Sequence, residues 1–170
     1  TGTIDAADNN TGLGVDVFAA LTSGDNNVAI GKSALTANTT GTKNIAIGAN
    51  SLDANTTGFH NVAIGQSALG AMNVTDGSST YNTAVGSHAG KVLTTGTRNT
   101  IVGGLAGEAI TTGQRNELVG YSAGTGITTG EYNSAIGYEA LALTTTGVRN
   151  VAIGTQALYT NVDGDNSVAI

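Results

Sequence analysis

One short segment of the sequence has the spacing of a catalytic nucleophile. Residues 120–124 read Gly-Tyr-Ser-Ala-Gly, and in hydrolases this G-x-S-x-G pattern holds a serine on a tight turn between a strand and a helix. Ser122 would need a histidine and an acid beside it, and the chain has 2 histidines, His60 and His88. The same pattern of positions recurs at residues 31–35. We therefore expect Ser122 to be a structural residue of a repeat, and the protein not to be an enzyme.

Three other motifs are too incomplete to indicate chemistry. Residues 31–33 (Gly-Lys-Ser) lack the leading glycine of a phosphate-binding loop, because Asn26 stands in its place. Residues 163–166 and 24–27 resemble fragments of calcium loops, but the further carboxylates are missing, which favours plain turns. The 12 acidic residues are scattered, so no carboxylate pair has the fixed separation of a glycosidase. We expect no cofactor and no metal site.

The composition excludes several classes of partner. The 170 residues include 26 glycines and no proline or cysteine, and only 11% are charged, against about 25% in ordinary soluble domains. The net charge of −6 disfavours nucleic acid and anionic membranes as partners. No apolar run approaches the length of a membrane span. We expect neither nucleic-acid binding nor membrane insertion.

A 17-residue repeat accounts for this composition. Each repeat starts at the asparagine before a Val-Ala-Ile-Gly-like phrase, and the starts are Asn10, Asn27, Asn44, Asn61, Asn82, Asn99, Asn116, Asn133 and Asn150, with a tenth at Ser167. Every interval is 17 residues except the 21 from Asn61 to Asn82, whose four extra residues lie between Met72 and Tyr81. We number the positions of each repeat from one, the asparagine, to seventeen. Residues 10–170 then form one repeat domain after a lead-in, residues 1–9.

The repeat predicts a β-solenoid. Position four is aliphatic and position five is glycine in every complete repeat, and position fifteen can be aligned as glycine from Gly24 to Gly164. Two glycines at fixed phase mark corners, where the backbone needs a positive φ or a close approach. The short β-type segments between them cannot stand alone and must pair with the next coil. We expect an all-β fold, a parallel β-solenoid of about ten 17-residue coils.

Strand alternation predicts which positions face inward. We expect position four to form the core of the coil, completed by leucine or glycine at position nine, and the asparagines of position one to stack as a ladder of amides. Position three is also apolar: Ala29, Ala46, Ala63, Ala84, Ile101, Leu118, Ala135 and Ala152. A thin coil has nothing of its own to cover a second apolar face. We therefore expect position three to face another copy of the chain, so that Ala46→Glu with Ala63→Glu would separate the copies.

Position seventeen could carry recognition. It forms a stripe of basic and aromatic residues on an acidic chain, and the candidate ligand-binding residues are Lys43, His60, Tyr81, Arg98, Arg115, Tyr132 and Arg149. Aromatic faces and guanidinium groups suit glycans. The alternative is that the residues of the stripe stabilise one another, with Arg115 and Arg149 stacked against Tyr132 between coils.

Threonines fill positions thirteen and fourteen of most repeats, from Thr39 and Thr40 to Thr145 and Thr146. Regular threonine arrays on flat solenoids can bind ice. Such arrays tend to use a T-x-T pair on one face of a strand, whereas adjacent threonines point to opposite sides. Ice binding is therefore an alternative of lower weight.

The phrases Asn-Val-Ala-Ile-Gly at residues 27–31 and Asn-Ser-Val-Ala-Ile at residues 166–170 resemble the head repeats of trimeric autotransporter adhesins of the YadA type. The longer phrase Ala-Leu-x-x-Asn-Thr-Thr-Gly, at residues 34–41, is similar to repeats of phage tail-fibre proteins and tail-fibre-like bacterial fibre proteins. The resemblance covers residues 10–170. It implies a left-handed β-roll assembled as a homotrimer in extracellular or virion fibres that bind surfaces. The period here exceeds that of the adhesin heads by an inserted Thr-Thr-Gly arm.

The hypothesis is therefore a structural and interaction protein: a shaft or head segment of a trimeric fibre that attaches to cell-surface glycans or protein receptors, at a cell surface or on a virion. The alternatives are an ice-binding threonine-rich solenoid, which thermal hysteresis would identify, and part of a polysaccharide-degrading tailspike, which release of reducing sugar would identify.

The last coil generates a prediction. Residues 166–170 stop inside a repeat, one residue before its glycine, and leave an open pairing edge without a polar cap. We expect the native polypeptide to continue past Ile170, and this segment alone to fray or associate end to end. Amide hydrogen exchange should be much faster in residues 166–170 than in residues 133–137. Equal protection in a particle that does not stack would contradict the prediction.

Overall fold

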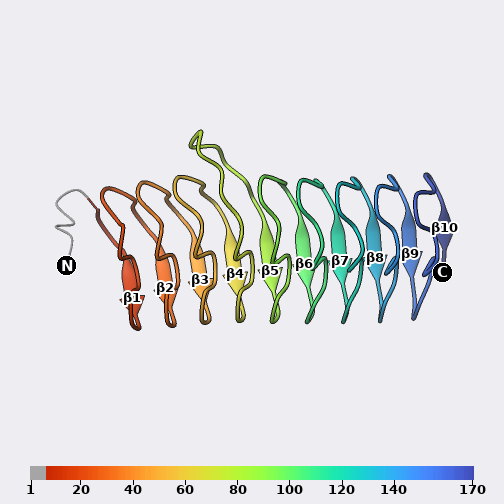
Figure 1. Ribbon diagram of the computed structural model, residues 1–170, viewed down its shortest axis with the longest axis horizontal. Coiled ribbons are helices and arrows are strands. Elements are labelled where there is room, and N and C mark those ends of the chain that lie inside the picture. Colours follow the sequence, from red (N-terminus) through yellow and green to blue (C-terminus); the bar gives the residue numbers. More distant parts are fainter. Residues whose placement is uncertain (1–6) are drawn as a thin grey trace.

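The computed structural model describes residues 7–170 as a single stack of coils (Figure 1). Each coil contributes one short strand, and the strands are Thr11–Leu13 (β1), Val28–Ile30 (β2), Ile45–Ile47 (β3), Val62–Ile64 (β4), Thr83–Val85 (β5), Thr100–Val102 (β6), Glu117–Val119 (β7), Ser134–Ile136 (β8), Val151–Ile153 (β9) and Val168–Ala169 (β10). They form one 10-stranded parallel sheet in chain order. The predicted all-β parallel solenoid is confirmed. Of the predicted lead-in, residues 1–6 lie outside the described part.

Coils stack in strict register. Each residue of a strand pairs with the residue at the same position of the next coil, as Ala29 does with Ala46. Hydrogen bonds between coils continue beyond the strands: Ser33 N–H donates to the Val15 carbonyl at 2.8 Å, and Thr39 N–H to the Thr56 carbonyl at 2.9 Å. The backbone polar groups of the turns are thus satisfied by the neighbouring coil. Among the described residues, no helix is long and apolar enough to cross a bilayer.

The predicted inward and outward faces of the strands were wrong. The middle residue of each strand, position three, is completely buried inside the coil from Ala29 to Ala152. Position four, predicted to form the core, faces outward, and Ile136 and Ile153 are 38% and 37% exposed. The reason is geometric: beside leucine at position nine the narrow interior has room only for alanine at position three, and the larger residues of position four lie on the outer face. Ala46→Glu and Ala63→Glu would place a charge in the core and unfold the coil.

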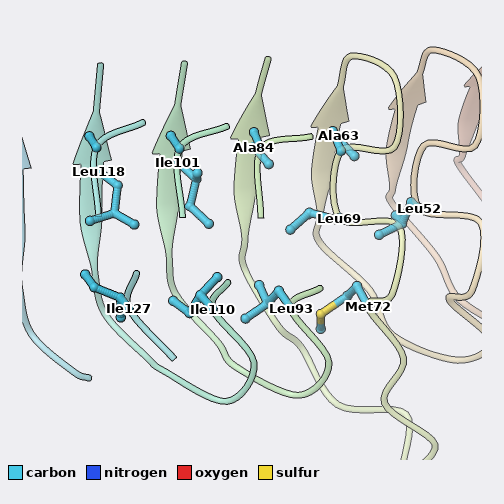
Figure 2. Packing of buried hydrophobic residues seen from close by; sticks show 14 of the residues in the cluster. Leu52, Ala63, Leu69, Met72, Ala84, Leu93, Ile101, Ile110, Leu118 and Ile127 are labelled. Carbon is cyan, nitrogen blue, oxygen red and sulfur yellow. The ribbon is translucent and has the colours of Figure 1, made fainter. Parts of the chain in front are cut away.

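The core is completed by positions eight, nine and twelve (Figure 2). The prediction for position nine is confirmed, because Leu35, Leu52, Leu69 and Leu141 are fully buried. Position twelve was not predicted: it contributes Met72, Leu93, Ile110 and Ile127 to the same core cluster, as a row that faces positions three and nine (Figure 2).

Within this core, small residues at one position accommodate large residues at another. Where position nine is glycine, larger side chains occupy its space. A Cβ on Gly107 would lie 2.9 Å from Leu118 Cδ1, and one on Gly124 would lie 2.7 Å from Leu118 Cδ2 and 2.9 Å from Ile127 Cδ1. In the coils with leucine at position nine, position three is alanine. Glycine at position nine thus makes room for larger side chains of positions three and twelve in its own or a neighbouring coil.

The asparagine ladder is confirmed. Asn99 donates its backbone N–H to Asn82 Oδ1 at 3.0 Å, and its Nδ2 donates to the Gly113 carbonyl at 2.9 Å. Asn99 Oδ1 in turn accepts the backbone N–H of Asn116 at 3.0 Å. The bond from each backbone N–H to the Oδ1 of the preceding asparagine recurs from Asn10 to Ser167. Each buried amide therefore joins its own coil to the two neighbouring coils.

The two glycine columns serve different purposes. Position five has φ between 122° and 140°, and a Cβ there would collide with the next coil, 2.6 Å from the Gly31 carbonyl oxygen in the case of Gly14. Position fifteen needs close approach alone, since a Cβ on Gly41 would lie 2.5 Å from the Gly58 carbonyl oxygen.

The alignment of position fifteen fails in the coil that begins at Asn61. Gly77, the residue aligned there, lies in open space, and Ser79 pairs with Phe59 of position sixteen. The four extra residues of this coil form a loop. This loop projects from the stack between β4 and β5 (Figure 1).

Breaking the ladder should be costly. Asn99→Ala removes the side-chain bonds to Asn82, Gly113 and Asn116 and leaves buried polar groups unpaired, which should lower the free energy of unfolding by about 3 kcal/mol. Denaturant titration measures this free energy of unfolding. The control Thr112→Ala changes an exposed residue and should be nearly neutral. Equal effects of the two variants would show that the ladder does not stabilise the fold.

Candidate recognition surface

The structure brings the predicted stripe together as one column. Its residues directly precede the buried asparagines, share a left-handed backbone with φ from 52° to 64°, and are exposed apart from the half-buried His60. Tyr81 and Tyr132 are 52% and 46% exposed. The side chains of successive coils therefore stand beside one another along the solenoid.

At one end of this stripe, side chains of successive coils stabilise one another as predicted. The Arg115 guanidinium lies 5.1 Å from the centre of the Tyr132 ring and its Nη1 donates to the Tyr132 hydroxyl at 2.7 Å. Arg149 lies 5.8 Å from the same ring. The predicted cation–π stacking is confirmed. It leaves the outer edges of these groups open to a ligand.

The other end is aromatic. The rings of His60 and Tyr81 stack at 4.9 Å with an interplanar angle of 6°, and Phe59 meets His60 edge-on at 5.3 Å. The projecting loop adjoins this cluster, because Ser79 Oγ lies 3.3 Å from His60 Nδ1. Phe59 was not among the residues predicted from the sequence, because position sixteen shows no aromatic pattern.

Ser122 lies where the repeat places it. It is buried, and its φ of 54° is shared by its whole column, from Asp16 to Gln156, so this backbone belongs to the coil. Leu105 separates it from His88 in that column. The structure therefore does not bring a histidine to Ser122.

The other incomplete motifs also belong to the coil. The N–H groups of Gly31 and Ser33 donate to carbonyls of the preceding coil and are not free to cradle a phosphate. Asp25 Oδ1 accepts the N–H of Asp8 at 2.7 Å, and Asp165 Oδ1 accepts that of Val148 at 2.8 Å. Within residues 7–170, no group of three or more metal-ligating side chains gathers.

The two threonine columns differ in exposure and in hydrogen bonding. Hydroxyls at position thirteen donate to the backbone of the next coil, as Thr111 Oγ1 does to the Thr128 carbonyl at 3.1 Å. Position fourteen is mostly exposed, as at Thr112 and Thr129. The two columns thus do not form one flat outward array, and this arrangement gives the ice-binding alternative no support.

The outer face of the sheet is a second surface. Position four presents an aliphatic column along the whole stack: Leu13, Ile30, Ile47, Ile64, Val85, Val102, Val119, Ile136 and Ile153. Position two adds Val28, Ile45, Val62 and Val151 beside it, and is polar at Thr100, Glu117 and Ser134. The aliphatic residues of position four were predicted from the sequence, but with the wrong direction.

Comparison with models of known families finds no match, and comparison with curated proteins finds no similar protein. What these surfaces bind must therefore be inferred from the chemistry of their own residues.

The stack around Tyr132 generates a prediction. Tyr132→Leu removes the ring between Arg115 and Arg149 and should lower the free energy of unfolding by about 1 kcal/mol. Tyr132→Phe keeps the ring and loses only the hydroxyl, so its free energy of unfolding should lie between those of the parent and Tyr132→Leu. Denaturant titration of the three proteins decides. If Tyr132→Leu were as stable as the parent, the stack would not support the fold.

Proposed function

We propose that the chain is a non-catalytic structural and interaction protein, a segment of a homotrimeric extracellular or virion fibre that attaches to cell surfaces. The observation that carries this proposal is the outward aliphatic column of position four. It runs the length of the sheet and is only partly covered by its own coil, as the exposed fractions of Ile136 and Ile153 show. Continuous apolar surface of this kind is typical of interaction sites.

The partner that suits this column is another copy of the chain. Aliphatic side chains recur once per coil, at the spacing of hydrogen-bonded strands, about 4.8 Å. Only a surface with the same axial repeat can pack against every coil, and an identical solenoid has it. A threefold arrangement is favoured by the resemblance to trimeric adhesin heads and tail fibres.

The stripe of position seventeen is the proposed ligand surface of the fibre. Its guanidinium groups and phenol rings offer donors and aromatic faces to a glycan or a protein receptor. In an assembly of copies, the stripe would be repeated once per chain along the fibre, so weak contacts with a repetitive cell-surface polymer would add through multivalency.

Sedimentation equilibrium tests the assembly. The parent should sediment as a trimer. Ile47→Glu together with Ile64→Glu puts charges on the outer sheet face, where burial by a partner would be unfavourable, and should give folded monomers.

The control is Thr40→Glu with Thr112→Glu, which adds the same charge at the exposed corner and should leave the trimer intact. Circular dichroism establishes that each variant is folded. A monomeric parent, or a trimer that survives both outer-face glutamates, would overturn the proposed interface.

A further inference from the structure

A notch interrupts the turn segments of three consecutive coils, away from both surfaces described above. It has a volume of about 290 Å³ and is lined by Asn50, Asp53, Ser67, Gly70, Ala71, Lys91 and Val92. That volume is near the lower end of the range for small-molecule sites, which begins at about 300 Å³. It is large enough for a single sugar or amino-acid unit.

Gly70 creates the notch. It is the only glycine at position ten, where the other complete coils carry Ala19, Thr36, Asp53, Lys91, Glu108, Thr125, Ala142 and Tyr159. A Cβ on Gly70 would lie 3.3 Å from Asp53 Oδ1 and 3.4 Å from the Ser67 carbonyl oxygen. The absence of a side chain at Gly70 thus leaves a depression directly beside the Asp53 carboxylate.

Opposite charges flank the opening. Asp53 lies one coil before Gly70 and Lys91 one coil after it, so their backbones are about 10 Å apart. Burial raises the pKa of the Asp53 carboxyl, opposed by a hydrogen bond from its own backbone, and no cation within residues 7–170 contributes to the shift. Within that part of the chain, the carboxylate is partly desolvated without a cationic partner. A bound cation would therefore stabilise it.

The remaining lining residues are neutral. Ala71 and Val92 are half-buried apolar residues of adjacent coils, and Asn50 and Ser67 add an amide and a hydroxyl. An ammonium group would lie against Asp53 and a carboxylate against Lys91, with the carbon frame between them on Ala71 and Val92.

We propose that this notch binds a small zwitterionic group, one that carries an ammonium and a carboxylate a few atoms apart, as an amino sugar acid or an amino acid does. The site lies within a single chain and does not require the proposed trimer. It would give a fibre a second kind of recognition site.

The test is a titration of the isotopically labelled protein with muramic acid, a glucosamine with a free amine and a lactyl carboxylate, followed by the amide signals of Asp53, Gly70 and Lys91. Saturable shifts confined to these coils are expected. N-acetylmuramic acid lacks the ammonium and glucosamine lacks the carboxylate, and each should bind about three- to five-fold more weakly. γ-Aminobutyrate carries both charges without the sugar ring: equal binding would assign the site to the charge pair alone, and weaker binding would add the sugar ring to what is recognised.

Three variants test the residues. Asp53→Asn and Lys91→Gln should each remove the preference for the zwitterion over the analogue that lacks the corresponding charge. Gly70→Ala should weaken all binding by filling the notch, in a column where Ala19 and Ala142 show that alanine fits the fold.

The matched controls Asp163→Asn and Lys32→Gln alter exposed charges elsewhere and should leave the titration unchanged. Absence of local shifts with muramic acid, or equal affinity for all three sugars, would overturn the proposal. Neither outcome would bear on the trimer, which sedimentation tests separately.

Discussion

The structure depends on the hydrogen bonds that join each coil to the next. Strands of two or three residues cannot persist alone, and their stability comes from pairing with the same positions one coil away. The asparagine ladder fixes this register from inside, because a buried amide such as that of Asn99 bonds to both neighbouring coils and to the position-fifteen carbonyl of its own coil. A slip by one residue would expose the amides to apolar surroundings and turn every strand over.

That constraint explains the composition. Close stacking requires glycine at position five and, outside the coil with the projecting loop, at position fifteen. The narrow interior admits alanine at position three unless a neighbouring residue is smaller, as Gly107 and Gly124 are around Leu118. Charged residues and the aliphatic residues of position four therefore lie on the outside. There they form the aliphatic sheet face, the stripe of position seventeen, and the notch at Gly70. Each proposed interaction uses a column that stacking leaves free to vary.

The repeat predicted the solenoid, the ladder, the stripe and the contacts of Tyr132, because each of these follows from equal spacing. The sequence could not assign the faces of the strands. Ala46 and Ile47 are both apolar, and which of them turns inward depends on the width of the coil, which a pattern does not contain. Left-handed φ at Ser122 and Leu35 was also hidden, since neither residue type favours it. The notch needed coordinates, because it arises from three coils and a single missing side chain.

A distance between copies tests the central claim, that the outward sheet face is where chains meet. The chain has no cysteine, so Thr100→Cys carries a single nitroxide label at an exposed, polar position of β6. Dipolar spectroscopy should find one short distance between labels on different chains, and a longer one from Asp76→Cys on the projecting loop. Absence of coupling from Thr100→Cys, or a shorter distance from Asp76→Cys, would contradict the account.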